Sequence, residues 1–216
     1  MSSLRKVFVC LMVLVSSVAL SATLGYAYTV SHCVSVPLAS TNWNTTISIP
    51  KFTGDCECLQ SVCFQLCGHV EGTAKFESMD ASATTVAMNL QSTITLSRPD
   101  LSPLVVVIPL ANTSDNVTAF DGTIDFGGTS GRTYGGLSGD DIDSMCSTAP
   151  ADFALFCGTG NIDLPIGALG TSYGSGAGNL ILQFSTSASA NATVTYTYDC
   201  GTPVEGSTWG RIKGLF

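Results

Sequence analysis

The chain has 216 residues, only 11% of them charged, and its 16 acidic residues outnumber eight Lys and Arg to give a net charge of −8. An anionic surface repels both the phosphate backbone of nucleic acids and the headgroups of anionic membranes. We therefore expect neither a nucleic-acid-binding protein nor one that docks on such a membrane.

The first 27 residues have the pattern of an export signal. Arg5 and Lys6 precede an apolar run over residues 7–20, and Gly25 and Ala27 are the small residues that a cleavage site needs. The run is shorter than the roughly 20 residues that span a bilayer, so we expect cleavage near Ala27 and no transmembrane segment in the mature chain. We expect the mature protein to be secreted, either extracellular or held at the cell surface.

Cysteine usage agrees with export, because the eight cysteines that follow the signal are an even number, which in an exported chain indicates disulfides. These candidates are Cys33, Cys56, Cys58, Cys63, Cys67, Cys146, Cys157 and Cys200. Cys63 and Cys67 lie on one face of a predicted strand, about 13 Å apart, so they cannot bond to each other. We expect four disulfides: Cys33 with Cys200, Cys146 with Cys157, and Cys56 and Cys58 with Cys63 and Cys67 or with the first strand.

Beyond the signal, short runs with β character alternate with Gly, Asn, Asp and Ser. Alternating apolar and polar residues predict strands over residues 61–70 and 84–96. A continuous apolar run predicts a buried strand over residues 104–110, ending near Pro109. The remaining predicted strands cover residues 158–164, 180–190 and 192–198.

The connections between these runs are predicted from their turn residues. Asp121-Gly122 predicts the turn of a hairpin over residues 117–126, and residues 112–115 and 127–141 are predicted to be surface loops. The best helical candidate is a single turn over residues 140–145. Ten or more short strands with glycine-rich turns predict an all-β fold, an antiparallel β-sandwich or jelly-roll-like single domain. We place this domain at residues 28–200, after the signal and before a linker and tail at 201–216.

The segment AFDGTIDFGGTSG at residues 119–131 resembles the choice-of-anchor E family of exported bacterial proteins. Further matching segments follow in family order on both sides, among them GTA at 72–74, MDA at 79–81 and FCGTG at 156–160. The resemblance covers about residues 34–198. It implies an all-β secreted domain, carried by proteins that differ in their C-terminal sorting signal, and it implies no catalytic residues.

The C-terminal tail departs from the Pro-Glu-Pro motif and transmembrane segment that many members of that family carry. Trp209, Gly210, Arg211 and Lys213 instead resemble a short Trp-Gly-x-x-Lys ending found on some exported bacterial proteins. A tail of this length cannot span a membrane. We expect it to be a recognition tag for secretion or surface attachment.

Catalytic and metal-binding patterns are sparse. A hydrolytic triad needs a histidine, and the only histidines are His32 and His69. The cysteine-rich segment at residues 56–69 has a Cys-x-Cys spacing that is tight for a structural zinc site, which favours disulfides. The run Asp140, Asp141 and Asp143 is either a calcium site or a solvated acidic turn, and it lacks the glycine and distal glutamate of an EF-hand loop. We predict no enzyme, no cofactor and no metal site.

The sequence thus predicts an exported structural or adhesive protein whose partners are cell-surface or matrix components or further copies of itself. One alternative is a carbohydrate- or calcium-dependent binding module, for which Trp43, Tyr134 and Tyr173 are the aromatic candidates near loops. Another is a filament subunit whose N-terminal strand, residues 28–36, inserts into a neighbour.

Overall fold

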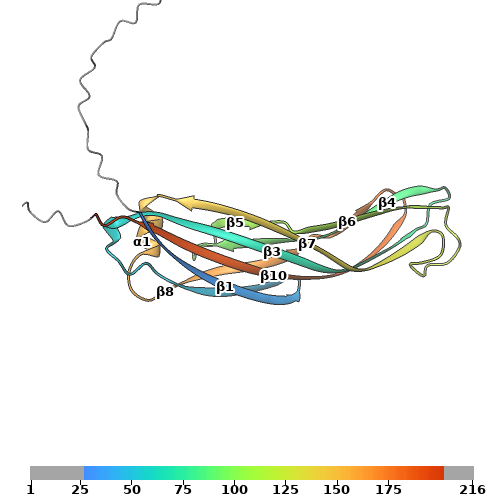
Figure 1. Cartoon of the computed structure of the whole chain (residues 1–216). Coiled ribbons are helices and arrows are strands. Elements are labelled where there is room, and N and C mark those ends of the chain that lie inside the picture. Colours follow the sequence, from blue (N-terminus) through green and yellow to red (C-terminus); the bar gives the residue numbers. More distant parts are fainter. Residues whose placement is uncertain (1–26, 202–216) are drawn as a thin grey trace, which may run out of the picture.

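Two antiparallel β-sheets pack face to face in the computed structural model, which describes residues 27–201 (Figure 1). The first, sheet A, has four strands in the order β1 (Tyr28–Ser40), β10 (Leu180–Tyr198), β3 (Leu59–Ser78) and β7 (Gly131–Ser147). The second, sheet B, has the order β2 (Trp43–Pro50), β8 (Asn161–Gly170), β4 (Thr84–Ser97) and β5 (Pro103–Val107). Two more strands, β6 (Leu110–Val117) and β9 (Tyr173–Ser175), pair with the other half of β4. The predicted all-β antiparallel sandwich is confirmed.

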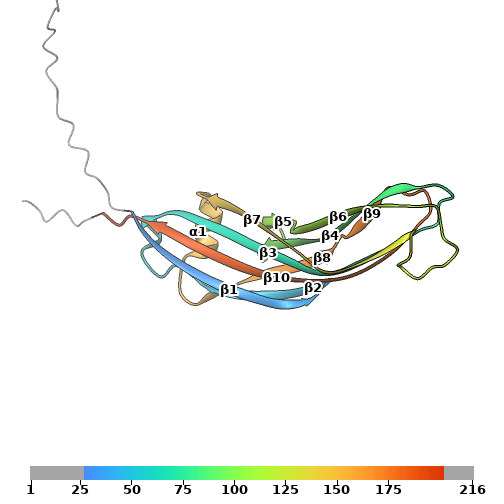
Figure 2. The same cartoon turned by 45° about the vertical axis from the view of Figure 1, so that its right-hand side comes forward.

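The strands of sheet A are long, which makes the sandwich narrow and elongated (Figure 2). Strand β3 has 20 residues and β10 has 19. The sequence predicted two shorter strands over residues 180–198, but Asn191 keeps the alternation and β10 runs through it. In β10, small buried residues such as Ala190 and Ala192 alternate with Ser and Thr. Because side chains of a strand point alternately to its two faces, the alanines all face the core.

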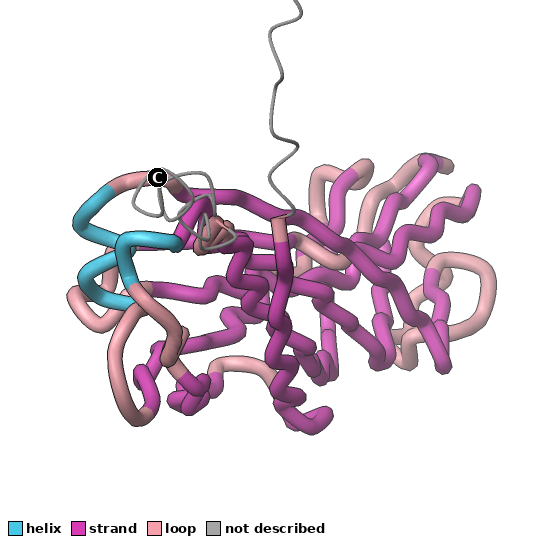
Figure 3. The backbone as a smooth tube through the Cα atoms, turned by 60° about the vertical axis from the view of Figure 1, so that its left-hand side comes forward, coloured by secondary structure: helices cyan, strands magenta, loops and turns pink. Residues whose placement is uncertain are grey.

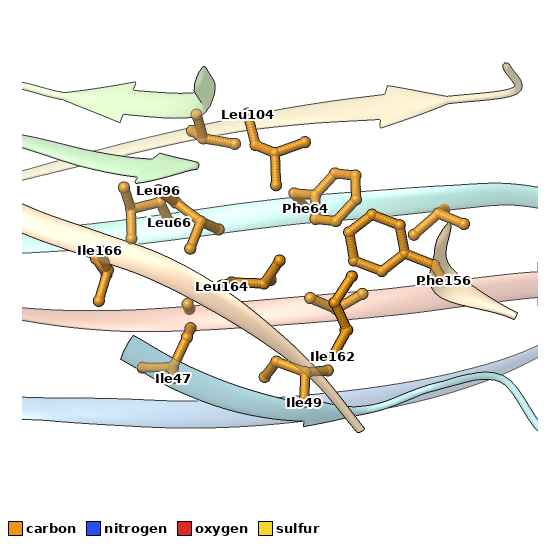
Figure 4. Close-up of a cluster of buried hydrophobic side chains, with 14 of the residues drawn as sticks. Ile47, Ile49, Phe64, Leu66, Leu96, Leu104, Phe156, Ile162, Leu164 and Ile166 are labelled. Atoms are coloured by element: carbon orange, nitrogen blue, oxygen red, sulfur yellow. The ribbon is translucent and has the colours of Figure 1, made fainter. Parts of the chain in front are cut away.

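The main core lies between the sheets and draws on nearly every strand near one end (Figure 4). Its fully buried side chains include Ile49, Phe64, Leu66, Leu96, Phe156 and Leu164. A smaller cluster continues the core toward the other end, with Phe76, Val86 and Met88 at its centre. Burial along the whole length of the two long sheets therefore holds the elongated shape.

The helical segments lie at one end of the sandwich (Figure 3). They are the 3-10 turn η1 (Cys56–Cys58) and the helix α1 (Pro150–Phe156), which begins with a proline at a position where its missing N–H costs nothing. The predicted helical turn over 140–145 is wrong. Those residues belong to β7, where they pair in register with β3 from His69 to Phe64.

Three predicted connections also differ from the structure. There is no hairpin over residues 117–126, because β6 ends at Val117 and residues 118–130 form one loop. Residues 112–115 lie inside β6, and most of 127–141 lies in β7. Glycine has a packing role in β7, since a Cβ on Gly139 would collide with the Leu110 carbonyl of neighbouring β6.

Both ends of the described chain lie at the same end of the sandwich (Figures 1 and 2). Tyr28 opposes Tyr198 in the β1–β10 register, and their rings stack with centroids 5.8 Å apart. We call this end, with η1, α1 and residues 28 and 201, the disulfide pole. The opposite end carries the loops at residues 79–83, 118–130 and 176–179, and we call it the loop pole. No helix within residues 27–201 is long and apolar enough to cross a membrane.

Candidate functional site

Three disulfides fasten the disulfide pole. Cys56–Cys157 joins η1 to the end of α1, with a Cα–Cα distance of 5.8 Å. Cys58–Cys200 joins η1 to the segment after β10, and Cys63–Cys146 joins β3 to β7. Three disulfides are typical of a protein that folds in an oxidising compartment outside the cytoplasm.

The predicted pairing of these cysteines is wrong, because it depended on strand neighbours that the sequence does not reveal. The predicted Cys33–Cys200 bond fails although β1 and β10 are neighbours, since their register places Cys33 opposite Thr193. Cys146 bonds to Cys63 rather than to Cys157, because β7 lies beside β3 and the two residues directly oppose each other.

The remaining part of the cysteine prediction is partly correct. Cys63 and Cys67 share the outer face of β3 and do not bond to each other, as expected. Cys56 and Cys58 bond to Cys157 and Cys200, not to Cys63 and Cys67 or the first strand. The number of disulfides is three, not four, and two thiols stay free: Cys33, which is exposed, and Cys67, which is half-buried.

The loop pole is organised by one fully buried carboxylate, Glu77 near the end of β3. Its Oε1 accepts the hydroxyl proton of Ser130 at 2.6 Å, and its Oε2 accepts the backbone N–H of Phe126 at 2.8 Å. Both donors belong to the loop of residues 118–130. A buried carboxylate is costly unless it is hydrogen-bonded, so Glu77 fixes this loop over the end of the sandwich.

Two further aspartates order the loop pole. The carboxylate of Asp80 accepts the backbone N–H groups of Gly178 at 2.7 Å and Asn179 at 2.8 Å, which ties two loops together. Asp121 accepts the N–H groups of Thr129 and Thr123, and these bonds lower its pKa. The loop pole is therefore an ordered surface on which these carboxylates lie near two cations: Arg132 donates to the Gly128 carbonyl, and Lys75 Nζ lies 6.0 Å from the centre of the Phe126 ring.

The arrangement at the loop pole suits recognition more than chemistry. Ile124 is 53% exposed between Asp121 and Asp125. Both carboxylates accept backbone N–H groups of their own loop, so their negative charge is held in place. An apolar side chain flanked by fixed carboxylates can contact a partner that presents apolar and cationic groups.

The acidic run predicted as a calcium site or a turn lies in strand β7. Asp140 faces out and its Oδ1 lies 2.7 Å from His69 Nδ1, while Asp141 accepts the backbone N–H of Ile108 at 2.7 Å. Alternation along the strand therefore puts Asp140 on one face of β7 and Asp141 and Asp143 on the other, so the three carboxylates do not converge. Among residues 27–201, no three His, Cys, Asp or Glu side chains are grouped as metal ligands would be.

His69 is expected to titrate above the ordinary value of 6.5. The hydrogen bond to Asp140 raises the pKa of His69, with a smaller contribution from Glu71 at 3.5 Å. Because the pKa of His69 is higher in the folded state, the stabilisation of the fold by the His69–Asp140 contact is present below pH 6.5. It is lost as the pH rises through the folded pKa.

NMR titration of the His69 imidazole should show that Asp140→Asn lowers its pKa. Asp141→Asn is the control and should leave it unchanged; an equal effect of both would contradict the assignment.

A partly buried ion pair ties α1 to the end of β4. Arg98 donates from Nε to Asp152 Oδ1 at 2.7 Å and from Nη2 to Oδ2 at 2.9 Å. The Asp152 side chain is only 7% exposed. Such a two-pronged contact fixes geometry as well as contributing energy, so it positions the helix against the core.

Arg98→Met is expected to lower the free energy of unfolding at pH 7 by about 2 kcal/mol, because it leaves Asp152 buried without its partner. The hydrogen bond from Arg98 lowers the pKa of Asp152 below 3.8. The stabilisation is therefore present above pH 3.8 and is lost as the pH falls through the folded value. Urea titrations between pH 7 and pH 2 should show wild type and variant converging in acid. Arg132→Met removes a longer and more exposed pair with Asp115, together with hydrogen bonds to the Gly128 and Gly131 carbonyls, and should have a clearly smaller effect that does not converge in acid.

The aromatic candidates for a carbohydrate platform do not form one surface. Trp43 packs against the core and its indole N–H donates to the Ala188 carbonyl at 3.3 Å. Tyr134 donates its hydroxyl proton to Asp115, and burial raises its pKa to about 12. Only Tyr173 is widely exposed, and it lies in β9 of sheet B whereas Tyr134 lies in β7 of sheet A.

An open depression of about 700 Å³ lies against strands β2, β4 and β8 of sheet B. Its polar lining includes Asn44, Thr46, Thr93 and Thr95, and no described side chain that lines it is ionisable. The depression therefore offers hydrogen-bonding groups without an acid or a base.

Two predicted features lie outside the described residues. They are the export signal at residues 1–27, of which only Ala27 is described, and the tail residues Trp209, Gly210, Arg211 and Lys213. Sequence reasoning in turn missed two features that the structure shows, Glu77 and the Arg98–Asp152 pair. For Glu77, the sequence offers one signal, which is a charged residue directly after an apolar strand residue, Phe76.

Comparisons with known proteins do not identify a family. No family model and no curated protein matches the chain. Among solved structures, it is similar to a chain of infectious bursal disease virus Gx strain at 11% identity over 82% of this chain and 38% of that one, with a TM-score of 0.19. A chain from the Gt strain of that virus gives 11% identity, coverage of 89% and 50%, and a TM-score of 0.13. The chain spans half or less of these solved chains, and TM-scores this low do not establish a common fold.

Proposed function

We propose that this protein is an exported structural or adhesive β-sandwich that is held at a cell surface or matrix by its disulfide pole and presents its loop pole outward. The observation that carries the proposal is the position of the chain ends. Residues 28 and 201 both lie at the disulfide pole, where Cys58–Cys200 fastens the last described segment. The sorting-like tail continues from that pole, so an attachment through it leaves the loop pole farthest from the point of attachment.

The geometry of the described residues supports a non-catalytic role. His32 lies on the inner face of β1, with its ring centroid 6.1 Å from that of Tyr196, whereas His69 lies on the outer face of β3. The two histidines therefore cannot act in one site. The depression on sheet B supplies no acid or base, and the carboxylates of the loop pole are engaged by backbone N–H groups.

The intact mass of the exported protein tests the attachment. A chain that begins at Tyr28, ends before Trp209 and contains three intrachain disulfides, each of which makes it two hydrogens lighter than its reduced form, supports export, tail processing and the three bonds of the structure. A chain that still ends at Phe216 and is recovered only from the medium contradicts attachment through the tail.

A binding assay on beads tests whether the loop pole is the surface that adheres. Residues 28–201 are coupled to beads through a tag after Gly201, and their retention on isolated cell-envelope and matrix material is measured. We expect Ile124→Asp to reduce retention at least several-fold. Leu101→Asp, which changes an apolar residue that is 72% exposed in the β4–β5 turn, is the matched control and should retain binding. Equal retention of both variants would contradict adhesion through the loop pole.

A further inference from the structure

Two thiols in the described chain have no disulfide partner, although the other six cysteines there are all bonded. Cys33 and Cys67 both face outward from sheet A, on opposite sides of β10. Cys33 opposes Thr193 and Cys67 opposes Asn191, so two strand spacings, about 10 Å, separate the thiol-bearing strands. A disulfide needs Cα atoms within about 7 Å. The two thiols of one chain therefore cannot bond to each other.

Cys33 lies in the strand at the edge of sheet A. Strand β1 pairs with β10 on one side only, so its other side presents free backbone N–H and C=O groups. Proteins commonly protect such an edge with charged residues, proline or a bulge. The first irregularity in β1 comes between Val36 and Ala39, next to Pro37. Residues 28–36 contain none of these protective features, so this stretch of edge can accept another strand.

The composition around Cys33 favours a second copy of this chain as that strand. The chain has a net charge of −8, yet neither β1 nor the adjacent edge strand β2 contains a Lys, Arg, Asp or Glu. Two anionic copies can therefore approach along this side without like charges meeting. Three exposed apolar side chains also lie in β1: Tyr28, Val30 and Leu38, which are 57%, 36% and 45% exposed.

We propose that two copies of this protein pair antiparallel along β1, about a two-fold axis at Cys33, and are joined there by a Cys33–Cys33 disulfide. In this register Val30 opposes Val36 of the second copy, and Ser31 opposes Ser35. Directly opposite residues of antiparallel strands have Cα atoms about 4.5 to 5.5 Å apart, which a disulfide spans. The molecule already contains one such bond, because Cys63 and Cys146 directly oppose each other on β3 and β7.

The bond forms by thiol–disulfide exchange. One Cys33 thiolate attacks the disulfide of an oxidised thiol–disulfide oxidoreductase or of oxidised glutathione and releases one thiol. The Cys33 thiolate of the second copy then attacks the mixed disulfide and releases the second thiol. The two Cys33 thiols together lose two protons and two electrons. The oxidant takes up the two protons and the two electrons as its disulfide is reduced to two thiols.

The first test compares the two free thiols. The chain from Tyr28 to Phe216 is incubated with oxidised glutathione, and products are separated by non-reducing electrophoresis and mapped by mass spectrometry of disulfide-linked peptides. We expect a covalent dimer linked through Cys33 in both chains. Cys33→Ser should abolish it, whereas Cys67→Ser, the matched control on the same face, should leave it intact. A dimer that survives Cys33→Ser, a Cys33–Cys67 cross-link, or a wild type that stays monomeric overturns the proposal.

A second test examines the register. Ser31→Lys with Ser35→Lys places like charges opposite each other twice in the proposed dimer, whereas Ser31→Lys with Ser35→Glu places opposite charges there. The rates of dimer formation of the two variants should differ by roughly tenfold, in favour of the oppositely charged pair. Equal rates would show that Cys33 reacts without strand pairing and would overturn the edge-to-edge arrangement.

Discussion

Removal of the Cys56–Cys157 disulfide, by Cys56→Ser together with Cys157→Ala, is expected to lower the free energy of unfolding by about 4 kcal/mol. The bond links residues 101 positions apart, so it restricts a long loop of the unfolded chain. It also holds the end of α1 against η1 in the folded state. Guanidinium titration should show a clearly lower midpoint for the double variant.

The control for this experiment is Cys67→Ser. It removes a half-buried sulfur that forms no disulfide, so the midpoint should hardly move. A double variant with the midpoint of the control would show that the Cys56–Cys157 bond does not stabilise the fold. Cys157 is replaced by alanine because it is 8% exposed, and a buried hydroxyl there would add a separate cost.

Phe156→Ala should cost about 4 kcal/mol of unfolding free energy, within the range for a fully buried phenylalanine. Phe156 is 0% exposed, and its ring centroid lies 4.9 Å from that of Phe64 in the core between the sheets (Figure 4). Truncation leaves a cavity that the two long sheets cannot close without shifting. Denaturant titration measures the loss.

Phe153→Ala provides a matched comparison, because Phe153 belongs to the same helix and is only partly buried against the same core. Its cost should be clearly smaller, and an equal or larger cost would show that α1 contributes through its other face. Phe156 also precedes Cys157. Phe156→Ala should therefore cost less in the variant without the Cys56–Cys157 disulfide, since both changes act on one segment.

The fold class could be predicted from the sequence because alternation is a local signal. Residues 61–70 and 84–96 alternate clearly, and each lies within a longer strand of the structure. The lengths were not predictable in the same way. Glycines and aspartates in residues 127–141 indicated a loop, yet β7 takes them because it pairs with β3 and because Gly139 allows close approach to β6.

The candidate site could be predicted less well, because it depends on contacts between distant segments. Simple alternation along β3 gives Glu77 an outward position, and it is buried only because the loop of residues 118–130 folds over it. The partner of Cys146 is likewise fixed by the β3–β7 register. Arg98 and Asp152 are 54 residues apart, and the sequence around each residue does not indicate that the other is its partner.

The Cys58–Cys200 bond has a mechanical consequence for the attachment proposed above. A pull on the chain after residue 201 reaches η1 and the start of β3 through this bond, as well as β10 through the backbone. Strands β10 and β3 run antiparallel side by side almost from Leu180 to Tyr198. A load between the two poles acts along these strands, and because the bond pulls β10 and β3 at the same end, the two strands share the tension and are not peeled apart one hydrogen bond after another.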